Sequence, residues 1–218
     1  METKIHLSPL ESDLVKRTDW ILAKRSTIDK VSGFFGMLAE RYRERLPEGG
    51  AGLPAFLRNA VPRIARGENY LGLPYVMMDF PAVFHREGIL AVRTFFWWGH
   101  FFSITLHVSG KYVACLDIAA MAPVLEERHF FVCVNTDEWN HTFEPENYAP
   151  AGGVSDARQW REPAAFLKIA KRIGVEAWEE IPLFLEAGFR DVLRLLEVSY
   201  RCGEADPLPG LPTGDSGP

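Results

Sequence analysis

The strongest pattern in the chain lies between residues 88 and 109, where two runs rich in β-branched and aromatic residues meet at Gly99-His100. Such runs around a glycine that can take a positive φ predict a β-hairpin with a two-residue turn. One side of this ribbon then gathers Val92, Thr94, Phe96, Trp98, Phe101, Ser103, Thr105 and His107, and the other carries Arg93, Phe95, Trp97, Phe102, Ile104, Leu106 and Val108. The second side is almost wholly apolar, so we expect it to lie on the core.

Helical periodicity marks both ends of the chain. A capping-box pattern that begins at Ser8 predicts a helix over residues 9–25. Apolar residues at three- and four-residue steps predict a second helix over residues 28–46. The same spacing predicts a last helix, which begins at Pro182 and has ended by Gly203.

Shorter apolar runs predict the remaining elements. Strands are expected over residues 75–80, where Pro81 stops the strand, and over residues 129–135. Residues 111–121 fit a helical stripe. Residues 165–173 fit a strand and a helix, and we favour the strand because apolar and basic side chains alternate there.

The order of these elements predicts an α+β fold: an antiparallel-dominated sheet of four or five strands with N-terminal and C-terminal helices packed on it. A chain of 218 residues that is 47% hydrophobic suits one domain, which we expect over residues 1–202. Residues 203–218 are rich in Pro and Gly and are expected to form a disordered tail.

The charge distribution and the lack of long apolar runs limit the classes of partner that we expect. Residues 126–218 hold 9 Lys or Arg against 17 Asp or Glu, which argues against nucleic acid as a partner. No apolar run approaches the roughly 20 residues of a membrane span, and the start of the chain lacks a signal-peptide pattern. We therefore expect a cytoplasmic protein without a membrane partner.

The widely spaced Cys115, Cys133 and Cys202 form no Cys-x-x-Cys pair, so we expect free buried thiols.

Arg93 is the strongest anomaly, because the predicted register places its charge on the apolar side of the hairpin. A buried arginine requires a carboxylate, since removing one partner of a buried ion pair costs on the order of 3 to 5 kcal/mol. Asp79 and Glu68 are the candidates. We prefer a structural ion pair; the alternative is an arginine that binds an anionic ligand with its planar guanidinium group.

The opposite side of the hairpin combines aromatic rings with hydroxyl groups and an imidazole, as small-molecule pockets do. A loop predicted over residues 63–75 adds further polar and aromatic groups. The candidate ligand-binding residues are Tyr70, Tyr75, Arg93, Thr94, Trp98, Phe101, Ser103 and Thr105. The competing and slightly favoured interpretation is a structural face covered by the helix of residues 28–46. The six histidines lack metal-ligand spacing, and neither a nucleophile elbow nor a phosphate loop occurs, so no metal or cofactor is indicated.

Three stretches resemble parts of a known family: Glu68-Asn-Tyr-Leu-Gly-Leu-Pro-Tyr75, Arg93-Thr-Phe-Phe-Trp-Trp-Gly99 and Phe101-Phe-Ser-Ile-Thr-Leu-His-Val-Ser-Gly110. Together they are similar to a family of uncharacterised bacterial proteins of similar length, and the likeness covers most of the chain. The resemblance implies a bacterial, cytoplasmic protein. It implies no activity, cofactor or site.

The first functional hypothesis is a binding protein, in which a small ligand or a protein partner meets the aromatic face around Trp98 and Phe101. The alternative is an enzyme that acts on an anionic small molecule. Its pocket would hold Glu68, Asp79, Arg93 and His107, with His107 or a carboxylate as the general base. A third hypothesis is a homodimer that pairs through the same aromatic face.

Overall fold

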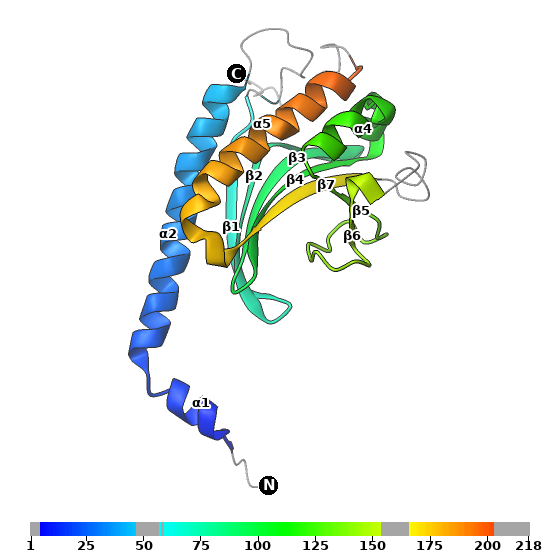
Figure 1. Cartoon of the computed structure of the whole chain (residues 1–218). Coiled ribbons are helices and arrows are strands. Elements are labelled where there is room, and N and C mark those ends of the chain that lie inside the picture. Colours follow the sequence, from blue (N-terminus) through cyan, green and yellow to red (C-terminus); the bar gives the residue numbers. More distant parts are fainter. Residues whose placement is uncertain (1–4, 47–56, 58, 154–165, 203–218) are drawn as a thin grey trace, which may run out of the picture.

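The computed structural model describes residues 5–46, 57, 59–153 and 166–202. Seven antiparallel strands form one curved sheet in the order β1-β2-β3-β4-β7-β5-β6 (Figure 1). Along the chain these are β1 (Arg63–Tyr70), β2 (Leu73–His85), β3 (Gly88–Trp97), β4 (Phe101–Ser109), β5 (Phe131–Cys133), β6 (Tyr148–Pro150) and β7 (Phe166–Gly174). The α+β class is therefore confirmed, with seven strands in place of the expected four or five.

Helices cover one face of the sheet, here called the helix face (Figure 1). They are α2 (Thr18–Arg45), α4 (Ile118–Glu127) and α5 (Ile181–Ser199), while the short α1 (Pro9–Leu14) precedes them. Within the described residues, 3₁₀ segments occur at η1 (Gly110–Cys115), η2 (Ala151–Gly153) and η4 (Val175–Glu180). None of the helices in the described residues is both long and apolar enough to cross a membrane.

The helix face carries the larger apolar core. Tyr42 of α2 and Phe189 of α5 stack with ring centroids 3.9 Å apart. The methyl Cγ2 of Ile104 on β4 lies only 2.6 Å from where a Cβ on Gly188 of α5 would stand, so the glycine lets this helix approach the sheet. Phe35 of α2 meets Phe102 of β4 edge to face. Large-to-small changes in such packing cost about 2 to 5 kcal/mol each.

The register of the central hairpin differs from the prediction by one residue. Trp97 pairs with Phe101, so the loop holds three residues, and Gly99 takes its positive φ of 74° there. Because side chains alternate between faces, this shift changes which side chains of the two strands share a side. Arg93 now lies opposite Thr105, whereas Thr94 lies opposite Ile104 on the helix face. The predicted covering of the polar side by the helix of residues 28–46 holds only for its β3 part, which lies on the helix face with α2. It is wrong for the β4 part, from Phe101 to His107, which lies on the other face.

Several predicted boundaries move. The helix predicted over residues 9–25 is divided, because α1 ends at Leu14 and α2 begins at Thr18. Helix α2 then continues without a break at residue 27 to Arg45. Strand β2 continues through Pro81 by a register shift between Asp79 and Ala82. The segment predicted as a loop over residues 63–75 contains β1, which pairs with β2 along most of its length. The strand favoured for residues 165–173 is confirmed as β7.

The helix predicted over residues 111–121 is divided between η1 and α4, and α4 includes Pro123. The strand predicted over residues 129–135 is shorter, with only Phe131–Cys133 paired. The predicted tail, residues 203–218, lies outside the described residues.

The expectation of free thiols is wrong for two cysteines, because Cys115 and Cys202 form a disulfide. The fold brings them together where an antiparallel bridge joins Leu116 to Tyr200, a contact that their sequence separation of 87 does not reveal. Cys133 is free and half-buried.

Candidate functional site

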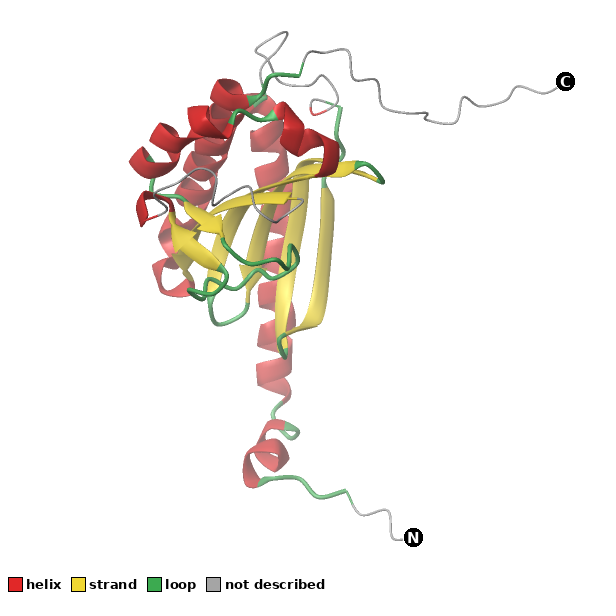
Figure 2. Ribbon diagram, turned by 90° about the vertical axis from the view of Figure 1, so that its right-hand side faces the viewer, coloured by secondary structure: helices red, strands yellow, loops and turns green. Residues whose placement is uncertain are grey.

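The second face of the sheet, here called the inner face, lies beneath residues 134–147, here called the strap. Strap residues contact side chains from β1, β3, β4 and β7, and the strap runs among the green loops in front of the strands in Figure 2. Side-chain turns hold the strap in shape, since Asp137 Oδ1 accepts from the Trp139 backbone N–H (2.9 Å) and Asn140 Oδ1 from that of Thr142 (3.0 Å). These turns give the strap its irregular shape.

Arg93 and Asp79 form a buried bidentate ion pair at the centre of the inner face. Arg93 Nε donates to Asp79 Oδ1 at 2.7 Å and Nη2 donates to Oδ2 at 2.9 Å. The two residues face each other in the β2–β3 register. The carboxylate expected for Arg93 is thus Asp79, whereas Glu68 is exposed and pairs with Lys24.

His141 extends this pair into the strap. Its Nε2 lies 3.1 Å from Arg93 Nη1, and burial, together with the cations Lys168 and Arg93, lowers its pKa well below the ordinary value. A neutral imidazole that accepts from a guanidinium at Nε2 carries its proton on Nδ1. The backbone N–H of His141 donates to the Tyr70 hydroxyl at 2.7 Å, which ties the strap to β1.

His107 of β4 forms a second polar pair with the strap. Its Nε2 lies 3.0 Å from Glu138 Oε2, and the imidazole is only 2% exposed. Burial, with smaller contributions from Lys168 and Arg93, lowers the pKa of His107 to about 3. At neutral pH the uncharged ring therefore donates from Nε2 to the Glu138 carboxylate, whose side chain is 30% exposed.

Lys168 of β7 stands directly opposite His107 and is 1% exposed. Within the described residues, the one hydrogen bond of its Nζ goes to the Asn140 carbonyl oxygen at 2.6 Å, and no carboxylate comes within ion-pair distance. Burial lowers the pKa of this ammonium group to about 8. A buried lysine with this pKa is typical of functional sites, although structural networks also produce such shifts.

Aromatic rings occupy the inner face on the far side of Arg93. Tyr70 meets Phe95 and Trp97 edge to face, and its pKa is raised by partial burial. The other aromatic residues of this cluster are Tyr75, Phe101, Phe131, Phe143 and Tyr148. The inner face therefore has a polar end and an aromatic end.

A cavity of about 290 Å³ opens at the polar end. It lies between the β2–β3 turn and the end of β4, and Glu138 and Phe166 line its inner side. His107 contacts both of these residues, through the hydrogen bond to Glu138 and a ring contact with Phe166 at 6.2 Å. Glu138 and Phe166 thus connect the lining of the cavity to His107.

The structure brings most of the sequence-predicted residues to the inner face and excludes three. The following share that face or its edge: Tyr70, Tyr75, Asp79, Arg93, Phe101, Ser103, Thr105 and His107. Thr94 and Trp98 instead belong to the helix face, and Glu68 lies at the exposed edge beside α2.

Sequence reasoning missed the residues that the strap, β6 and β7 contribute: Glu138, Trp139, Asn140, His141, Tyr148 and Lys168. For Lys168 there was a usable signal, because a lysine between Leu167 and Ile169 interrupts a strand that is otherwise apolar there. No local pattern places the strap over the sheet.

No group of three or more metal-ligating side chains occurs in the described residues. Comparison with protein-family models, with curated proteins and with solved structures yields no match for the chain. The resemblance to a bacterial family therefore stays an expectation, and function has to be argued from the inner face itself.

Proposed function

We propose that the protein binds a small organic carboxylate at the polar end of the inner face, beneath the strap. One observation carries this proposal: Lys168 is a fully buried ammonium group whose hydrogen bond, within the described residues, goes to a backbone carbonyl. A buried charge without a counter-ion is costly, and a bound carboxylate would supply that counter-ion.

The surrounding groups favour an anion over a cation. Arg93 is already neutralised by Asp79, and both His107 and His141 are neutral because their pKa values are lowered. Lys168 is then a buried cation that, among the described residues, contacts a backbone carbonyl and the Tyr148 ring but has no carboxylate within ion-pair distance. A neutral histidine beside it can offer an N–H donor to the same ligand if Glu138 gives up its hydrogen bond.

The cavity at the polar end supports a route for the ligand. Glu138 is a flexible side chain on the strap, and it lies between the cavity and His107. Rotation of this carboxylate away from His107 would open the way to Lys168. Arg86 also lines the cavity, together with Glu87, whose carboxylate pairs with Lys111.

An enzyme is the second candidate, with Glu138 rather than His107 as the general base. A pKa of about 3 makes His107 too weak a base at neutral pH, whereas Glu138 is partly exposed at the cavity wall and is oriented by the imidazole. In this hypothesis Lys168 holds the carboxylate of the substrate and Glu138 removes a proton from it.

The test is a calorimetric titration with acetate and benzoate, with benzyl alcohol as the neutral analogue. We expect the carboxylates to bind and the alcohol not to bind. Lys168→Met should abolish binding, whereas the control Lys171→Met should retain it, because Lys171 lies on the same strand but pairs with Asp191. Binding that survives in Lys168→Met, or equal binding of benzyl alcohol, contradicts the proposal.

A further inference from the structure

Residues 5–23, here called the arm, extend beyond the body of the protein. Figure 1 shows α1 and the first turns of α2 projecting past the end of the sheet, and every residue from 13 to 23 is exposed. Eight of the sixteen exposed large hydrophobic side chains in the described residues lie here: Ile5, Leu7, Leu10, Leu14, Val15, Trp20, Ile21 and Leu22. Such a concentration of exposed apolar side chains marks an interaction surface.

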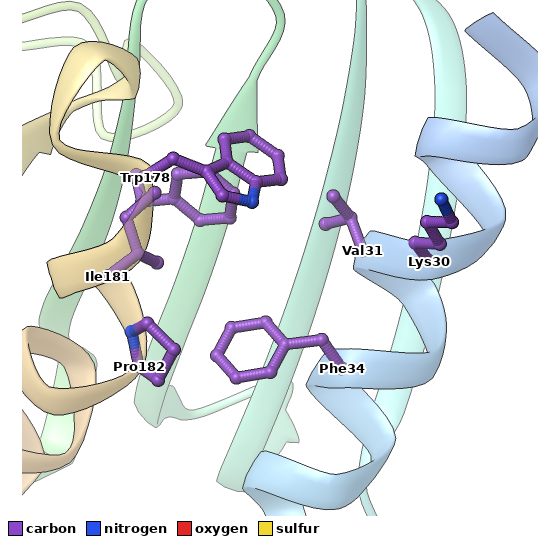
Figure 3. A pocket seen from close by; sticks show the side chains of 7 residues that line it. Lys30, Val31, Phe34, Trp178, Ile181 and Pro182 are labelled. Carbon is purple, nitrogen blue, oxygen red and sulfur yellow. The ribbon is translucent and has the colours of Figure 1, made fainter. Parts of the chain in front are cut away.

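The body presents an apolar pocket where α2 joins it (Figure 3). Its volume is about 210 Å³, larger than the 150 Å³ cavity that holds a benzene ring. Val31 and Phe34 of α2 form one wall, and Trp178, Ile181 and Pro182 form the other. Trp178 remains 43% exposed although its ring packs against Phe102, so the pocket has room for a large apolar side chain.

The arm cannot fill the pocket of its own chain. Trp20 and Phe34 belong to the same uninterrupted helix, and 14 residues of helix separate them by about 21 Å. Two apolar surfaces of one chain that cannot reach each other can meet between two copies. We propose that the arm of each copy docks into the pocket of the other, with Trp20 as the inserted side chain and the two α2 helices antiparallel.

Charge supports a second copy as the occupant. The arm holds Lys16 and Arg17 against Glu11, Asp13 and Asp19, so it lacks the basic excess with which helices bind anionic membranes or nucleic acid. Lys30 stands at the rim of the pocket and forms no ion pair within the described residues. Asp19 directly precedes Trp20 and forms an exposed pair with Arg17 at 3.0 Å, so docking brings this carboxylate to the lysine of the second copy as a further partner. A two-fold arrangement satisfies both arms and closes the assembly as a dimer.

Sedimentation equilibrium over a wide range of protein concentration tests the dimer. We expect a reversible dimer, and Trp20→Glu should raise its dissociation constant about 30-fold or more, because buried aromatic anchors dominate interfaces. Val61→Glu is the control, since Val61 is 75% exposed and outside both surfaces. Circular dichroism of Trp20→Glu should show an intact fold, because Trp20 is exposed in the monomer.

A charge exchange tests the contact between Asp19 and Lys30. Lys30→Glu should weaken the dimer and Asp19→Lys should restore it in the double variant. A monomer at every concentration overturns the proposal, as does a dimer that Trp20→Glu leaves as tight as the control does. Association of the monomer with phosphatidylglycerol vesicles through Trp20 overturns it as well. None of these outcomes depends on carboxylate binding at the inner face.

Discussion

The two faces of the sheet are made by the same strands and are covered in opposite ways. On the helix face, apolar side chains such as Phe102, Ile104 and Leu106 pack against α2 and α5. On the inner face, the alternate residues Thr105 and His107 lie beneath an irregular loop. The helices cover apolar side chains through close packing of their own apolar side chains. The strap covers polar side chains, because its carbonyl, carboxylate and imidazole groups form hydrogen bonds with them.

Burial has opposite effects on the free energy of folding on the two faces. Burial of apolar area stabilises the helix face directly. Burial on the inner face costs free energy unless each polar group finds a partner, and among the described residues the one hydrogen bond of Lys168 Nζ goes to a backbone carbonyl, beside a contact with the Tyr148 ring. Substitutions on the helix face should therefore change stability alone, and substitutions on the inner face should separate stability from binding.

The largest effect should come from breaking the buried ion pair of the inner face. Arg93→Met leaves the Asp79 carboxylate buried without its cation, so we expect a loss of about 3 to 5 kcal/mol in the free energy of unfolding. Urea denaturation measures this loss. The double variant Arg93→Met, Asp79→Leu should recover much of it, and a single variant as stable as the parent would mean that the pair is not buried.

On the helix face, Leu106→Ala should lower the free energy of unfolding by about 2 to 5 kcal/mol, because it removes a fully buried side chain. Acetate affinity, measured well below the unfolding midpoint, should stay unchanged. A loss of acetate binding in the folded variant would show that the two faces are coupled.

Lowering the pH should destabilise the folded protein through His107, because this imidazole is buried in its neutral form. The folded chain takes up this proton only near its lowered pKa of about 3, whereas the unfolded chain does so near 6.5. Stability is therefore lost as the pH falls from 6.5 towards 3, by about 2 kcal/mol at pH 5 for this group. Urea denaturation from pH 8 to pH 4 should show a shallower loss for His107→Gln, and equal slopes would refute a buried neutral imidazole.

Raising the pH should weaken acetate binding, because Lys168 loses its positive charge. With a pKa of about 8, the ammonium group is mostly neutral at pH 9, so acetate affinity should fall about tenfold between pH 7 and pH 9. The same lowered pKa means that this lysine destabilises the unliganded fold less as the pH rises from 8 towards 10.5. Calorimetry at several pH values measures the affinity, and a flat profile would argue against Lys168 as the anion-binding group.

Several features of the site could be predicted from single residues. An arginine within an apolar hairpin required a carboxylate, and Asp79 was one of the two candidates because it lies on a neighbouring strand. The identity of the hairpin was equally readable from its β-branched and aromatic runs. Its register was not, since a two-residue and a three-residue loop around Gly99 fit the same sequence and differ only in the packing that follows.

Local patterning by itself determined the hairpin, the long helices and the need for a partner at Arg93, because these depend on side-chain periodicity and on the cost of a buried charge. Tertiary structure decided which face of the hairpin meets the helices, that Lys168 joins His107, and that the strap lies over both. These arrangements depend on contacts between segments far apart in the chain, and the strap has no periodicity to indicate where it packs.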